Sequence, residues 1–119
     1  MAALKMEVIP YLESMIYLPM VLTILERDRL VFEQKNFKFK KPYLGLVDDV
    51  SKRVHRELGN TAAYLRANNM SVVKGKTDDI FTEYVFMHDQ QQDCRRYLNV
   101  RLRNRTEELL TQYLQKLDI

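Results

Sequence analysis

The chain has 119 residues, of which 46% are hydrophobic and 29% charged, and its formal net charge is +3 at pH 7. These values predict one helical domain, residues 1–119, with its own apolar core. The single cysteine, Cys94, excludes a disulfide within the chain and favours a reducing, cytoplasmic location. With only three glycines and no catalytic motif, the sequence excludes phosphate-binding loops, and we do not expect an enzyme.

Residues 6–25 are strongly apolar, yet the sequence argues against a membrane span or a signal sequence. Glu7 and Glu13 would have to enter the hydrocarbon, Pro10 and Pro19 would interrupt the helix, and no positively charged leader precedes a cleavage site. We therefore expect a core-forming segment without contact to a membrane. It should contain a short helical piece up to residue 18, a kink, and a helix from Pro19 to about residue 33.

Residues 35–43 combine four lysines with three aromatic rings. Positive charge beside flat rings can hold a phosphate backbone and stack on bases. The candidate nucleic-acid ligands of this segment are Lys35, Lys38, Lys40 and Lys41. The alternative is a loop between two helices in which Phe37 and Phe39 pack into the core while the lysines stay solvated.

The most regular periodicity predicts a helix over residues 42–68. Apolar residues recur there at steps of three or four: Tyr43, Val47, Val50, Val54, Leu58, Ala62 and Leu65. Gly59 and Asn60 weaken its middle. Asn68 and Asn69 suit its end, because asparagine tolerates the left-handed conformation that ends many helices.

Residues 70–87 predict a small β-hairpin, because β-branched and aromatic residues flank a Gly/Asp turn. The competing interpretation is a helix capped by Asp78 or Asp79, since Ile80, Tyr84 and Met87 also fit a helical stripe.

The last part of the chain is expected to be helical, either in two pieces or with a kink near Asn99. Its apolar residues are Leu98, Leu102, Leu109, Leu110, Tyr113, Leu114 and Leu117. The predicted fold is therefore mostly α: a bundle of three or four helices that carries one small hairpin at about 70–87.

Five arginines crowd into residues 95–105 and can fork onto phosphates or carboxylates. Three of them complete the set of candidate nucleic-acid ligands: Arg95, Arg96 and Arg103. Arg101 and Arg105 share a helical side, where pairing with Asp78 or Asp79 is the alternative.

Charge alternates in blocks along the chain. Residues 35–66 hold eight basic and three acidic side chains, and residues 94–119 hold six and three, whereas residues 1–34 and 67–93 are net acidic. If the two basic blocks meet, they form one positive face. If they contact the acidic blocks, the pattern serves internal complementarity or self-association.

His88 and Asp89, followed by Asp93 and Cys94, form the one cluster that resembles a metal site or a thiol–imidazole pair. On a helix His88 and Cys94 would lie about 240° apart, and the carboxylates lack spaced histidine ligands. We predict no metal site, no cofactor and no catalytic residue.

Several short motifs of the sequence resemble those of a known family: residues 17–23 (YLPMVLT), 42–44 (PYL), 81–84 (FTEY), and 102–104 (LRN) ahead of 107–109 (EEL). In these motifs the chain resembles the YhjD-like proteins, small uncharacterised proteins of Gram-positive spore formers and their phages. The resemblance covers most of the chain and implies a cytoplasmic bacterial or phage protein. The motifs have no known catalytic meaning, so no functional residue follows from them.

Together these observations predict a non-enzymatic interaction or assembly protein. The apolar segment at residues 6–25 favours a homo-oligomer, most simply a homodimer, because a chain of 119 residues has few places to bury it. The alternative is a nucleic-acid-binding regulatory protein that uses the basic segments 35–41 and 95–105.

Overall fold

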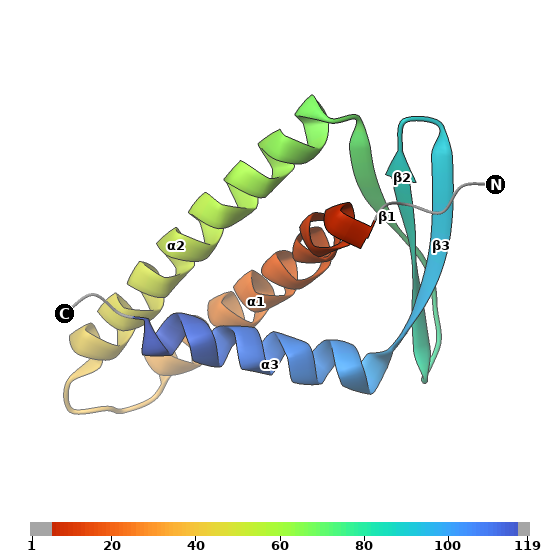
Figure 1. Cartoon of the computed structure of the whole chain (residues 1–119). Helices are drawn as coiled ribbons and strands as arrows, with labels where there is room; N and C mark the ends of the chain where they lie inside the picture. Colours follow the sequence, from red (N-terminus) through yellow and green to blue (C-terminus); the bar gives the residue numbers. More distant parts are fainter. Residues whose placement is uncertain (1–5, 117–119) are drawn as a thin grey trace.

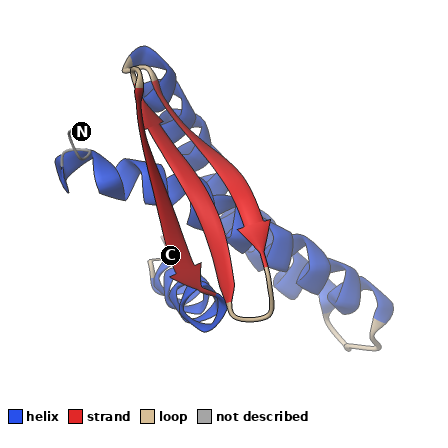
Figure 2. Cartoon of the chain, turned by 90° about the vertical axis from the view of Figure 1, so that its right-hand side faces the viewer, coloured by secondary structure: helices blue, strands red, loops and turns tan. Residues whose placement is uncertain are grey.

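The computed structural model describes residues 6–116, which form three α-helices and a three-stranded antiparallel sheet (Figure 1). The elements in chain order are η1 (Met6–Val8), α1 (Ile9–Gln34), α2 (Lys40–Ala67), β1 (Met70–Thr77), β2 (Phe81–His88), β3 (Gln91–Leu98) and α3 (Asn99–Gln115). The molecule is elongated, with extents of 59 × 33 × 19 Å. Figure 2 shows the helices on one side of the sheet, whose other face is not covered by the described chain.

The helix α1 runs without a break from Ile9 to Gln34, so the predicted division into two helical pieces at Pro19 is wrong. Pro10 lies in the first turn, where its missing N–H costs nothing, but Pro19 lies in the interior. Tertiary packing keeps the helix intact on both sides of Pro19. The buried residues of α1 are Leu12, Ile16, Leu18, Val21, Leu22 and Leu25.

The segment Met6–Gln34, with a mean hydropathy of 1.7, is long and apolar enough to cross a membrane by length and composition alone. A core helix passes the same test, and α1 contacts α2, α3 and β1. The predicted core-forming role of this segment is therefore confirmed.

Two hydrophobic clusters hold the elements together, and α1 contributes to both. One lies between the sheet and the helices and contains Val8, Leu12, Ile16, Leu65, Met70, Phe86 and Leu102. The other lies among the three helices and contains Leu18, Val21, Leu22, Leu25, Val47, Val50, Val54 and Tyr113.

The second helix, α2, begins two residues earlier than predicted and runs without a break through Gly59 and Asn60. It ends where predicted: Asn68 is the C-cap, and Asn69 adopts the left-handed conformation with φ 56°. The spacing of its apolar residues located this helix correctly, because one face packs against α1.

The predicted hairpin is confirmed by β1 and β2, and the alternative helix over residues 80–87 is wrong. The expected helix after residue 88 is wrong in its first part, because residues 91–98 form a third strand, β3. The fold is thus three helices plus a three-stranded sheet rather than a bundle with a hairpin. The kink expected near Asn99 is the junction at which β3 becomes α3, while Leu117 lies outside the described residues.

The register of the strands assigns each side chain to one of two faces. The inner face meets the helices and carries Met70, Val72, Lys74, Thr77, Thr82, Tyr84, Phe86, His88, Gln91, Asp93, Arg95 and Tyr97. The outer face carries Ser71, Val73, Gly75, Phe81, Glu83, Val85, Met87, Gln92, Cys94, Arg96 and Leu98.

Candidate interaction sites

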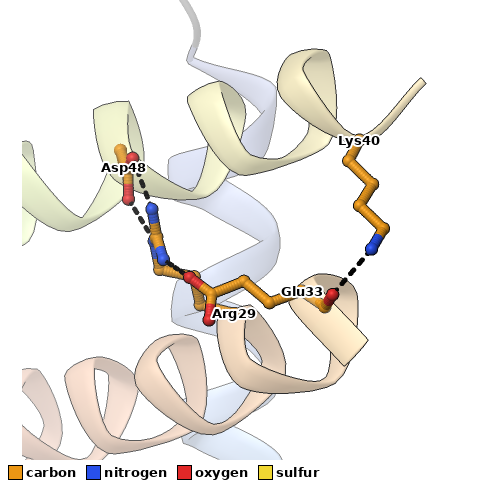
Figure 3. Close-up of polar contacts among 4 residues, drawn as sticks. All are labelled: Arg29, Glu33, Lys40 and Asp48. Atoms are coloured by element: carbon orange, nitrogen blue, oxygen red, sulfur yellow. Dashed lines mark hydrogen bonds and ion pairs between the residues drawn. The ribbon is translucent and has the colours of Figure 1, made fainter. Parts of the chain in front are cut away.

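The four candidate lysines lie at the end of the molecule opposite the sheet, where α1 turns into α2 (Figure 1). Lys35 and Lys38 are exposed in the connecting loop, and Lys40 and Lys41 lie in the first turn of α2. The Nζ atom of Lys40 donates a hydrogen bond of 2.7 Å to the carbonyl oxygen of Glu33 (Figure 3). Lys40 thereby closes the loop instead of reaching into solvent.

The aromatic residues of this loop do not pack as predicted. Phe37 packs with its ring tilted against Phe32 and Tyr43, at centroid distances of 5.3 and 5.6 Å. Phe39 is 66% exposed, so its predicted place in the core is wrong. Its ring lies instead beside the Lys38 ammonium, 5.7 Å from the centroid.

Acidic side chains near this loop are paired within the chain. Arg29 on α1 donates to both carboxylate oxygens of Asp48 on α2, at 2.7 and 3.3 Å, and to Glu33 (Figure 3). The hydrogen bond from Arg29 holds the pKa of Asp48 below its usual value. This exposed network ties α1 to α2 and has the features of a structural rather than a ligand-binding group.

The arginine candidates lie far from the lysines. Arg95 and Arg96 are on β3 in the sheet, and Arg103 is exposed on α3. In Figure 1 the lysine loop and β3 lie at opposite ends of the long axis of the molecule. Among the described residues, the candidate segments 35–41 and 95–105 therefore do not form one positive face. The two basic blocks meet elsewhere, where Arg53 of α2 donates hydrogen bonds to the carbonyl oxygens of Tyr113 and Lys116, at 2.8 and 3.0 Å.

A cavity of about 470 Å³ lies at the junction of β3 and α3, and Arg96, Arg101 and Arg105 form part of its lining. Residues of α1, β2, β3 and α3 line it: Glu13, Tyr17, Phe81, Arg96, Tyr97, Leu98, Arg101 and Arg105. Of the candidate residues predicted from sequence, only Arg96 lies here. A second cavity, of about 220 Å³, shares three of these residues: Glu13, Tyr17 and Arg105.

The polar groups of the larger cavity interact with one another. The Tyr97 hydroxyl donates to Glu13 Oε2 at 2.8 Å, and burial, with this carboxylate, raises the pKa of Tyr97. Burial and Glu13 also raise the pKa of Tyr17, whereas the positive charges of Arg105 and Arg101 act to lower it. Both tyrosines therefore keep their hydroxyl protons at neutral pH.

The predicted pairing of Arg101 or Arg105 with Asp78 or Asp79 is not among the ion pairs of the described residues. Asp78 instead accepts hydrogen bonds from the backbone N–H groups of Ile80 and Phe81, at 2.8 and 2.7 Å. Arg105 pairs with Glu108 on its own helix at 3.0 Å.

The four residues considered as a metal site or thiol–imidazole pair lie near the β2–β3 turn and along β3: His88, Asp89, Asp93 and Cys94. His88 Nε2 lies 3.6 Å from Asp89 Oδ2, and Asp93 is engaged by Arg95 at 2.8 Å. No group of three or more potential metal ligands occurs among residues 6–116.

The outer face of the sheet is the other candidate site, and sequence reasoning did not single it out. Val73 is 51% exposed and Leu98 37% exposed, and the partly buried Phe81, Val85 and Met87 lie on the same face. Alternation along the strands could have indicated it, but only once the partner strand β3 was known.

Comparison with known proteins gives two matches, and each covers nearly the whole chain. The model of the family described as "YhjD protein" matches residues 3–118. The protein named "Uncharacterized protein YhjD" from Bacillus subtilis (strain 168) is 33% identical over 114 residues, which are 96% of this chain and 95% of that protein. No solved structure matches the chain. The predicted family is thus confirmed, and the relative's name states no activity.

Proposed function

This chain belongs to the YhjD family, and from its own surfaces we propose that it is a non-enzymatic interaction protein that forms a homodimer through the outer face of its sheet. The single observation that carries the proposal is this apolar face, over which the described chain places no helix (Figure 2). The apolar segment at residues 6–25 supports an oligomer less strongly, because its buried residues lie in the core of its own chain.

The composition of the outer face is unusual for a sheet that meets water. Antiparallel sheets with one open face commonly place polar side chains there. Here Val73, Val85 and Cys94 form a row across the three strands, and Phe81 pairs with Leu98 across β2 and β3. The charged pair Glu83 and Arg96 lies between these two apolar groups. Exposed apolar side chains beside polar ones are typical of a protein–protein contact.

A second copy of the chain fits this face because its polar groups are self-complementary. Glu83 on β2 and Arg96 on β3 are directly paired in register on the outer face. A two-fold axis parallel to the strands, between β2 and β3, lays each β2 over the β3 of the other copy. Glu83 then faces the partner's Arg96, and Val85 faces the partner's Cys94.

The size of the face sets the expected strength of the dimer. Three strands of eight residues cover roughly 400 Å² at the usual strand spacing and rise. Standard interfaces bury about 800 Å² per partner. We therefore expect a dimer with a micromolar or weaker dissociation constant, which forms and dissociates with protein concentration.

Light scattering over a concentration series, from about 10 µM to about 1 mM, tests this function. The molar mass should rise from monomer to dimer, and Val85→Lys should weaken the dimer at least about tenfold, because a charge would be buried in the interface. Val100→Lys is the matched control, since Val100 is 59% exposed on α3. A constant monomer mass, or equal effects of both variants, would rule out this interface.

Nucleic-acid binding through residues 35–41 and 95–105 remains the alternative proposal, although the two segments share no face. It predicts a salt-sensitive mobility shift of DNA or RNA that weakens when Lys38, Lys40 and Lys41 are changed together to Gln. Absence of any shift at low salt would count against it.

A cytoplasmic location, without membrane attachment, belongs to the same proposal. The use of α1 as a core helix supports it. Cell fractionation that placed the protein in the membrane pellet would contradict it.

A further inference from the structure

We propose that the cavity at the junction of β3 and α3 binds a small phosphate monoester that carries an aromatic ring, such as a mononucleotide. This inference does not rest on the proposed dimer, although three residues, Phe81, Arg96 and Leu98, belong to both surfaces.

The first argument is the excess of positive charge around the cavity. Three guanidinium groups line it, from Arg96, Arg101 and Arg105, against the single carboxylate of Glu13. Glu13 already accepts a hydrogen bond from Tyr97. Arg96 and Arg101 take part in none of the ion pairs found among residues 6–116, so their donors are available to a ligand. Guanidinium groups bind phosphate through paired, charge-assisted hydrogen bonds.

The second argument is the electrostatics of α3, which begins at the cavity. Leu98 is its N-cap and lines the cavity, no side chain caps the helix, and its first turn contains no acidic residue. A helix N-terminus carries partial positive charge, so Arg101 in the first turns is placed where a basic residue is unfavourable. A bound anion would compensate both the helix dipole and the arginines.

The third argument is the shape and apolar lining of the site. The Arg96 guanidinium lies 4.0 Å from the centroid of Phe81, and Leu98 and the ring of Tyr97 complete the apolar lining. A volume of about 470 Å³ is within the range of sites for small organic ligands and exceeds the need of a bare ion. The ring of the ligand therefore has surfaces to contact, while Glu13 disfavours ligands with many negative charges.

Calorimetric titration of the whole chain with AMP, inorganic phosphate and adenosine tests this proposal at low salt. AMP should bind at least about tenfold more tightly than phosphate or adenosine, since only AMP supplies both the charge and the ring, and added salt should weaken its binding. No measurable binding of AMP at millimolar concentration, or equal affinity for adenosine, would overturn the proposal.

Matched variants locate the binding. Arg101→Gln should weaken AMP binding at least about tenfold. Arg103→Gln should leave it unchanged, because Arg103 is also exposed on α3 but does not line the cavity. Glu13→Gln should tighten binding about twofold or more, because it removes the negative charge and keeps an acceptor for Tyr97. Equal losses for both arginine variants, or weaker binding of the Glu13 variant, would overturn the assignment of this cavity. Failure of these tests leaves the dimer measurements at Val85 unaffected.

Discussion

The two faces of the sheet share one alternating pattern but meet different surroundings. On the inner face Met70 and Phe86 are 5% and 0% exposed and lie in the cluster with α1 and α3. On the outer face Val73 remains 51% exposed, and no described element covers it. The difference teaches that the apolar residues of one short sheet serve two purposes: one set stabilises the monomer, and the other is available to a partner.

Removing Phe86, the largest fully buried side chain among the described residues, should have the largest effect on stability. Phe86→Ala is expected to lower the free energy of unfolding by about 3–5 kcal/mol, because it empties a fully buried site. Chemical denaturation measures this change. The matched control is Phe81→Ala, on the same strand but the opposite face, which should cost less than half as much. Equal costs would mean that the two faces do not differ as described.

A buried hydroxyl on the inner face should have the next largest effect. The Thr82 hydroxyl donates to Asn99 Oδ1 at 2.6 Å and shares a hydrogen bond with Thr77, which joins β1 and β2 to the start of α3. Thr82→Val keeps the shape and leaves Asn99 without its donor, at a cost of about 1–3 kcal/mol.

The exposed Thr111, whose hydroxyl donates to the carbonyl of Glu107 in its own helix, offers a matched control. Thr111→Val should change the free energy of unfolding by less than about 0.5 kcal/mol. If both threonine variants behaved alike in denaturant, the junction between the sheet and α3 would not depend on Thr82.

The sequence predicted correctly those elements in which the spacing of apolar residues, or a local hydrogen bond, matches the contacts made in the fold. The residues of α2 alternate with helical period because one side faces α1, and the turn at Asp78 follows from local hydrogen bonds. Pro19 misled the prediction of α1, because burial on both sides of the proline outweighed its local preference.

The strand β3 could not be predicted from its own residues. Its sequence QQDCRRYL is mostly polar, and it is a strand because β2 pairs with it along its whole length. The cavity depends on that strand. Arg101 and Arg105 stood out as a pair four residues apart, but Glu13 and Tyr17 come from α1, and only the tertiary fold places them beside β3 and α3.

The smallest effect on stability is expected at the turn between β1 and β2, which contains Asp78, and this effect depends on pH. Hydrogen bonds from Phe81 and Ile80 hold the pKa of Asp78 below its usual value. The ionised carboxylate therefore stabilises the fold above the ordinary aspartate pKa of about 4, and this contribution is lost as the pH falls through the lower folded value.

Denaturation of the protein and of Asp78→Asn, from about pH 6 to about pH 3, measures this contribution. The wild-type advantage should shrink as the pH falls. An advantage that grows on acidification would contradict the assigned role of Asp78.

The central claim is that the outer face pairs with itself, β2 over the partner's β3, and charge exchange tests it most directly. Sedimentation equilibrium would be measured for Glu83→Arg, Arg96→Glu and the double variant. Each single change should weaken the dimer at least about tenfold, because like charges then face each other, and the double variant should recover most of the wild-type affinity. Single variants that dimerise like the wild type, or a double variant no stronger than either single one, would contradict it.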